Sequence, residues 1–307
     1  MSARNSLPLS LSLFATCLFS AGCDDSLKSV SLIEETRVLG ARVESDNDPT
    51  QASPLPGERA SLRFFVVAPS GAPSFSYAVS LCAVGLTNFG FPPCAGDPIA
   101  SAQQVEAGAA DARLEFVVPE QVDLQATPHA FARGLICPDS ALNVAANGDP
   151  SCVSGSGKEV AFEFPLGGRE DSNRNPSFTD DALLLDGEPW LANAGPSCDS
   201  RSTLRVSASS AHAIRVTFPD ADFEPLSQPT SVDPARETLL VSPFASAGKL
   251  DHGFISVSAD TPPEERRVSW VAPALPNGAP TVVHFYFVAR DARSGEDFAT
   301  RALCVVP

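Results

Sequence analysis

The stretch SFSYAVSLC, Ser74 to Cys82, decides the fold class of this chain. Every second residue in it is large and apolar, and the residues between them are serine or alanine. A period of two is that of a β-strand with one buried face. The apolar set that would point to one side is Phe75, Tyr77, Val79 and Leu81.

Strand patterns recur along the whole chain. TVVHFYFVAR, Thr281 to Arg290, is apolar on both faces, as expected of a strand inside a sheet. Turn-forming residues separate the patterns, as in PLPGE at 54–58 and ALPNGAP at 274–280. No amphipathic helix of three turns is evident, so the sequence predicts an all-β protein. Further predicted strands cover 37–44, 60–67, 113–118, 129–137, 159–164, 204–207, 213–218, 254–258, 267–272 and 298–306.

Length and composition divide the predicted strands into two bodies. A chain of 307 residues has room for about two domains at roughly 150 residues each. Six or seven short strands in 36–165 suit an antiparallel two-sheet sandwich of immunoglobulin or fibronectin type. The segment LGGREDSNRNPSFTDD at 166–181 is typical of a linker, and 182–307 repeats the pattern of the first body. The expected fold is therefore two tandem immunoglobulin-like β-sandwiches.

The charge balance argues against nucleic acid as a partner. The chain carries 21 basic and 37 acidic side chains, for a net charge of −16. Proteins bind nucleic acid by placing Lys and Arg on phosphates, and this surface repels phosphates. We interpret the acidity as that of a solvated, exported surface.

Residues 1–22 have the layout of an export signal. Arg4 precedes an apolar run from Leu7 to Phe19, and small residues follow at 20–22. The run is too short to form a stable membrane span, and no later segment has the ~18 apolar residues that a span needs. The body of the protein is therefore expected outside the cytoplasm.

Cys23 follows directly on this signal. The sequence Ser-Ala-Gly-Cys at 20–23 resembles the lipobox of bacterial lipoproteins, in which the cysteine is acylated and becomes the first mature residue. Ser20 stands where that pattern has Leu, Val or Ile, and an ordinary signal-peptidase cut before Cys23 is the alternative. The resemblance implies a lipid anchor at Cys23 and a tether over 23–35, with inner or outer membrane left undecided.

The cysteine count supports the anchor. Cys17 leaves with the signal, and lipidation of Cys23 leaves an even number for disulfides in an oxidising compartment. The favoured scheme pairs Cys82 with Cys94 and Cys137 with Cys152, each across a loop. It pairs Cys198 with Cys304, near the start and the end of the second body. The main rival pair is Cys82–Cys137. The six candidates are Cys82, Cys94, Cys137, Cys152, Cys198 and Cys304.

The search for catalytic motifs predicts no enzyme and no cofactor. His129, His212 and His284 lie in or beside strand patterns, where a structural role is expected. His252 lies beside Asp251 in a turn, but no G-x-S-x-G motif supplies a nucleophile. SGSGK at 154–158 lacks the spacing of a phosphate loop, and no zinc or dinucleotide motif occurs.

Calcium is the one metal for which candidate ligands exist. Carboxylates and amides gather in the linker, and these are the oxygen ligands that calcium prefers. Asx-rich turns have the same composition without metal, and the spacing of a calcium-binding loop is absent. The candidates are Asp171, Asn173, Asn175 and Asp180.

With its lipobox-like start and β-rich body, the chain resembles cell-envelope lipoproteins that carry tandem immunoglobulin-like domains. The resemblance implies a non-enzymatic binding, adhesive or structural role, with a membrane contact through the anchor and an envelope protein or glycan as ligand. The alternative is a glycan- or peptidoglycan-binding accessory module that uses an exposed Trp190, whereas Trp270 has the pattern of a core residue. A hydrolase with an unrecognised site, built around His252 and Asp251, is the third hypothesis.

Overall fold

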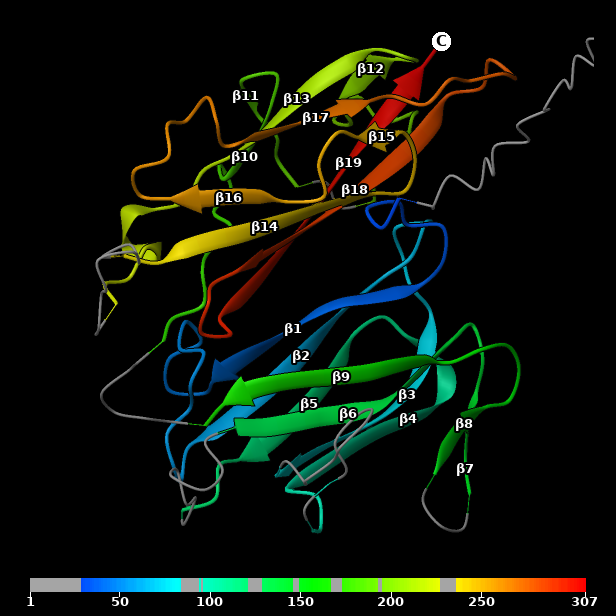
Figure 1. Cartoon of the computed structure of the whole chain (residues 1–307). Helices are drawn as coiled ribbons and strands as arrows, with labels where there is room; N and C mark the ends of the chain where they lie inside the picture. Colours follow the sequence, from blue (N-terminus) through cyan, green and yellow to red (C-terminus); the bar gives the residue numbers. More distant parts are fainter. Residues whose placement is uncertain are drawn as a thin grey trace, which may run out of the picture.

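The protein is all-β, as predicted, and folds into two stacked bodies (Figure 1). The computed structural model describes residues 29–83, 94, 96–120, 129–145, 149–166, 173–192, 195–226 and 236–307. Within these ranges the one helical element is a short 3₁₀ turn, Asp220–Asp222. Strands β1 to β9 build the first body and β10 to β19 the second, each as two sheets packed face to face around its own core.

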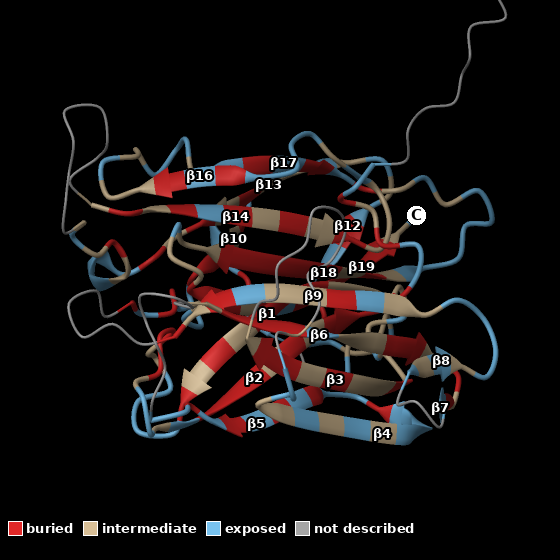
Figure 2. Ribbon diagram, turned by 60° about the horizontal axis from the view of Figure 1, so that its bottom comes forward, coloured by how far each residue is buried: buried red, intermediate tan, exposed pale blue. Residues whose placement is uncertain are grey.

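The first body is an antiparallel β-sandwich. The apolar residues of SFSYAVSLC project from β3 into the core, where Phe75 and Leu81 are fully buried. Figure 2 shows that β4, the edge strand of one sheet, carries mostly exposed and intermediate residues. One sheet has the order β1 (Arg37–Ser45), β2 (Arg59–Val67) and β5 (Ala112–Val117). The other has the order β4 (Ala100–Ala109), β3 (Phe75–Ala83), β6 (His129–Pro138) and β9 (Lys158–Pro165), with the hairpin of β7 (Leu142–Val144) and β8 (Pro150–Cys152) beside it.

The second body is also a β-sandwich. Trp190 and Trp270 lie edge-on against Phe285, each with a ring-centroid distance of 4.9 Å, in the middle of its core. One sheet has the order β11 (Glu188–Pro189), β10 (Leu183–Leu185), β13 (Ala211–Val216), β17 (Arg267–Val271) and β15 (Lys249–Leu250). The other has the order β12 (Arg205–Ser207), β19 (Glu296–Val306), β18 (Thr281–Arg290), β14 (Thr238–Ala245) and β16 (Ile255–Ser258).

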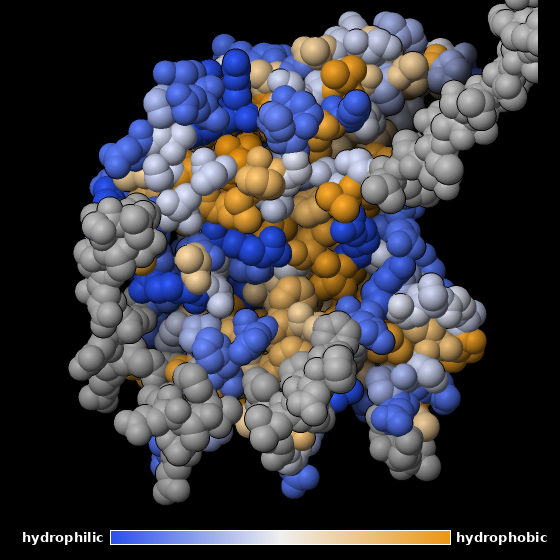
Figure 3. Space-filling model, viewed as in Figure 1, coloured by the Kyte–Doolittle hydropathy of each residue, from blue (hydrophilic) through white to orange (hydrophobic). Residues whose placement is uncertain are grey.

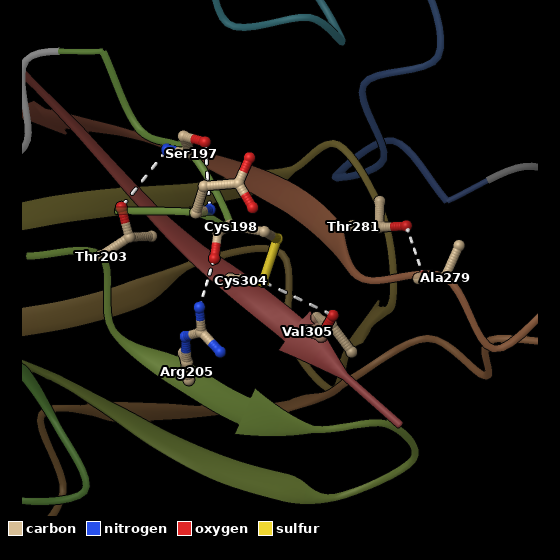
Figure 4. The surroundings of a disulfide bond; sticks show 9 residues. Ser197, Cys198, Thr203, Arg205, Ala279, Thr281, Cys304 and Val305 are labelled. Atoms are coloured by element: carbon tan, nitrogen blue, oxygen red, sulfur yellow. Dashed lines mark hydrogen bonds between the residues drawn. A yellow bond between two sulfur atoms is a disulfide. The ribbon is translucent and has the colours of Figure 1, made fainter. Parts of the chain in front are cut away.

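Three disulfides join the six candidate cysteines in the pairing that the sequence favoured. They are Cys82–Cys94, Cys137–Cys152 and Cys198–Cys304, with Cα–Cα distances of 5.2, 5.4 and 5.2 Å. The rival pair is excluded by register, because Cys137 lies opposite Ser76, at the other end of β3 from Cys82. Figure 4 shows the third bond, which ties β19 to the segment before β12; the Arg205 guanidinium donates to the Cys198 carbonyl beside it.

The two bodies meet through a third, smaller apolar cluster. It contains Tyr286 and Val288 of β18 together with Val67 of β2, and the rings of Phe65 and Phe298 stack across it at 4.6 Å. Figure 3 shows hydrophobic residues gathering where the upper and lower bodies meet.

Residues 29–35 differ from the free tether that their polar composition suggested. Leu32 forms a parallel bridge with Ala245 at the edge of β14, and Ile33 is fully buried in the joint between the two bodies. Backbone hydrogen bonds run from Ile33 N to Ala245 O and from Ala245 N to Ser31 O, both at 2.9 Å. The segment is therefore an added edge of the second sandwich.

Candidate functional site

A groove of about 640 Å³ lies on the outer face of the sheet that contains β3, β6 and β9. Antiparallel register brings its floor together, with Ser80 opposite Arg133 and Ala78 opposite Leu135. On the next strand Glu159 lies opposite Leu135. Along SFSYAVSLC, residues of the groove floor alternate with residues of the buried face. The floor residues of this strand are small, so they leave room above the sheet.

Glycine at position 134 lets two floor strands approach closely. A Cβ atom at this position would lie 2.2 Å from the Ala78 carbonyl oxygen and 2.7 Å from Val79 Cα. Both are main-chain atoms of β3, so no side-chain movement relieves the clash. A larger residue would force β3 and β6 apart beneath the groove.

Two charged side chains point from the floor to solvent. Arg133 and Glu159 are exposed, and neither makes a hydrogen bond or ion pair within the described ranges. Asp149 adds a third charge at the rim. An unpaired guanidinium beside an unpaired carboxylate is suited to a polar ligand that offers both an acceptor and a donor.

Both disulfides of the first body hold the walls of this groove. Cys94 lines it directly and is bonded to Cys82 at the end of β3. On the other side Asp149 and Pro150 line it, and the neighbouring Cys152 is bonded to Cys137 of β6. The walls are therefore covalently tied to the strands that form the floor.

The predicted anchor and the predicted calcium ligands have different outcomes. Cys23 and Asp171 lie outside the described residues. Asn175 is buried and uses both ends of its amide within the protein, since Nδ2 donates to Val43 O at 2.7 Å and Oδ1 accepts from Glu296 N at 3.0 Å. Asp180 is exposed, whereas Asn173 is buried with no partner for its Oδ1. No three His, Cys, Asp or Glu side chains of the described part converge as metal ligands.

The histidine singled out by the sequence is not the one with catalytic geometry. His252 is exposed, and its Nε2 lies 3.9 Å from the Asp251 carboxylate. His212, on β13, instead lies between a serine and an aspartate: Nε2 is 2.6 Å from Ser210 Oγ and Nδ1 is 2.7 Å from Asp186 Oδ2. This order of groups is that of a Ser-His-Asp triad.

The surroundings of Ser210 limit what this triad can do. The Ser210 hydroxyl also donates to Ser207 O, so one proton serves two acceptors. The amides of Ala208, Ser209 and Ser210 already donate to main-chain carbonyls, which leaves none of these three for an oxyanion. Burial acts to raise the pKa of Asp186, but hydrogen bonds from His212 and Ala213 N hold it below its usual range.

Trp190 is buried, contrary to the exposure that the glycan-binding hypothesis requires. Its side chain is 0% exposed, and its Nε1 donates to Ala302 O at 3.3 Å. Trp190 directly follows the β10–β11 hairpin, and its amide donates to Leu183 O at 2.8 Å, which holds it against the sheet edge. Trp190 is a core residue, as is Trp270.

Comparison with known proteins shows only distant likenesses. No family model matches the sequence, and no curated protein matches it. Among solved structures, the fibronectin(III)-like modules of Clostridium thermocellum CbhA are 11% identical, with 86% of this chain and 93% of that chain covered at a TM-score of 0.22. A nucleoside hydrolase-related protein from Saccharophagus degradans is 14% identical over 44% of this chain and 26% of that chain, with a TM-score of 0.24. Red sea bream transglutaminase is 12% identical over 88% and 32%, with a TM-score of 0.25. Likenesses at this level carry no argument about activity.

Three disulfides indicate an extracellular or envelope environment, because such bonds persist where the surroundings are oxidising. The described residues contain no helix of the length and hydrophobicity that a membrane crossing requires.

Proposed function

We propose that the protein is a non-enzymatic, lipid-anchored protein of the cell envelope whose first sandwich binds a polar segment of another envelope protein. The groove over β3, β6 and β9 carries this proposal, because it combines a preformed hollow with the unpaired charges of Arg133 and Glu159. The lipobox-like sequence at Cys23 supplies the anchor. A glycan ligand is less favoured, since the groove has no aromatic side chain among its described lining residues.

The binding role is tested by photo-crosslinking in cells. In one variant a photoreactive residue replaces Ser80 on the groove floor. In a second variant of the same protein it replaces Ser269, an exposed strand position of the second sandwich. We expect a discrete adduct only from position 80, lost on Arg133→Ala and kept on Arg267→Ala, which removes an exposed strand arginine elsewhere. Equal adducts from both positions, or none from position 80, would contradict the binding role.

The anchor is tested separately by intact mass and membrane fractionation of the wild type and Cys23→Ser. We expect a diacylglyceryl mass on the wild type and release of the variant, since acyl chains provide the membrane affinity. Unmodified, soluble protein in both cases would contradict the anchor without affecting the groove.

A hydrolase is the second candidate, favoured by the contacts of His212 with Ser210 and Asp186. In such a step Ser210 Oγ would attack an activated ester, His212 would accept its proton and return it to the leaving alcohol, and water would then release the acyl group. Labelling by a fluorophosphonate probe, lost on Ser210→Ala, tests it. A protein that takes up no label is not an enzyme of this type.

A further inference from the structure

A partly buried polar network joins the linker to the tip of the β18–β19 hairpin. Arg293, at this tip, donates from Nε to Glu237 Oε1 and from Nη2 to Glu224 Oε2, both at 2.5 Å. Asp291 Oδ1 accepts from the amides of Arg293 and Gly295 at 2.7 and 2.8 Å. From the linker, Asn173 Nδ2 donates to the Arg293 carbonyl at 3.0 Å.

The network has an excess of negative charge. Three carboxylates, those of Glu224, Glu237 and Asp291, surround the single guanidinium of Arg293, which leaves a formal charge of −2. Water penetrates such a place poorly, so the excess charge is costly unless a cation offsets it.

Three buried oxygen atoms of this network have no hydrogen-bond partner. They are Asn173 Oδ1, Glu237 Oε2 and Asp291 Oδ2. The residues Asn173 and Glu237 are only 1% and 2% exposed. Leaving a buried polar group without a partner costs about 1–3 kcal/mol, and more when the group is charged, so three together indicate a missing ligand.

Glycine at position 295 packs closely against two oxygens of this network. A Cβ atom there would lie 2.2 Å from Asp291 Oδ2 and 2.8 Å from the Arg174 carbonyl oxygen. The carboxylate oxygen and the carbonyl oxygen therefore lie near each other, on the same side of Gly295. Any side chain at this position would collide with both.

We infer that these oxygens bind one calcium ion, held by Asp291 Oδ2, Glu237 Oε2, Asn173 Oδ1 and the Arg174 carbonyl. The ligands are all oxygens, two of them charged, and a divalent ion cancels the charge of −2. Calcium accepts six to eight ligands in irregular geometry, with waters completing the shell, whereas magnesium demands a near-ideal octahedron. The ion would tie the linker to the second sandwich, and it retains Asn173 from the predicted set while replacing Asn175 and Asp180 as ligands.

Calorimetric titration of the chelator-treated full-length protein with CaCl₂ tests the site. We expect saturable binding of one ion, weakened at least tenfold by Asp291→Asn and by Glu237→Gln. Asp180→Asn is the matched control, because it removes an exposed carboxylate from the same linker and should leave the affinity unchanged.

Thermal unfolding gives a second measurement that does not depend on heat of binding. CaCl₂ should raise the midpoint of the wild type and of Asp180→Asn but not that of Asp291→Asn, and MgCl₂ at the same concentration should have less effect. No calcium-dependent heat or shift would overturn the inference and leave ordered water as the partner of these oxygens. Equal weakening by Asp180→Asn would also overturn it, since the binding would then be a surface-charge effect.

Discussion

The Cys198–Cys304 disulfide should dominate the stability of the second sandwich. It closes a loop with a sequence separation of 106 residues and ties β19 to the segment before β12. A cross-link over about 100 residues removes conformational entropy from the unfolded chain and so stabilises the folded state by about 4.7 kcal/mol. The separation of 15 residues between Cys137 and Cys152 corresponds to a stabilisation of about 3 kcal/mol. Replacing Cys198 and Cys304 by alanine should therefore lower the free energy of unfolding by about 4–5 kcal/mol.

The chain offers a selective probe for this experiment. Its only two tryptophans, Trp190 and Trp270, both lie in the core of the second sandwich. Tryptophan fluorescence during urea denaturation therefore follows the second sandwich alone. The Cys137→Ala/Cys152→Ala variant is the matched control, and it should move this transition by less than about 0.5 kcal/mol, because distant sites act independently.

Two results would refute the reasoning. A loss below about 1 kcal/mol on removal of Cys198–Cys304 would mean that the cross-link does not restrict the unfolded chain as the loop length requires. An equal shift in the control would mean that the two sandwiches unfold as one unit, so that loop length within each body does not set the result.

Three further variants probe the joint between the two sandwiches and the hydrogen bonds of His212. Burial raises the pKa of Tyr286 to about 12, against about 10 in an unfolded chain. The neutral phenol therefore contributes fully to the free energy of unfolding below pH 10, and about 3 kcal/mol of that free energy is lost as the pH rises to 12. Tyr286→Phe should lack this alkaline loss, and identical pH profiles of unfolding would contradict the assignment. His212→Ala should lower the free energy of unfolding in the tryptophan-monitored transition by about 1–2 kcal/mol, because it removes two hydrogen bonds; an unchanged midpoint would show that the cluster is not structural. Gly71→Ala should cost about 1–3 kcal/mol by calorimetry, since φ is +84° and the new Cβ would lie 2.1 Å from His284 Cε1; a neutral result would mean that this turn readily rearranges.

Period-two alternation predicted most of the long strands, and it missed strands in which exposure or a proline obscures the apolar pattern. β4, with the sequence ASAQQVEAGA, was not predicted because it lies at a sheet edge and is mostly exposed, so it has no apolar alternation. β14 was not predicted because Pro243 interrupts TLLVSPFA, and proline cannot donate to a ladder. β16 pairs only with Thr238–Val241, so Pro243 lies beyond the end of that ladder and breaks no bond to it.

The sequence contained less information about the sites than about the strands. The groove depends on register between β3, β6 and β9, which sets Arg133 beside Ser80 although 53 positions separate them. The partner of His212 had a local signal, because Asp186–Gly187 is a strong hairpin-turn dipeptide between two short apolar runs. That turn places Asp186 against β13, where its carboxylate meets His212.

The joint holds parts of both predicted connecting segments in place. Residues 31–33 lie in the predicted tether and 173–178 in the predicted linker, yet each satisfies backbone groups against a folded edge. Ile33 alone supplies the apolar burial on one side, and Asn175 bridges Val43 of β1 to Glu296 of β19 on the other. Because polar backbone groups need partners wherever they are buried, a segment of polar residues can be as firmly placed as a strand.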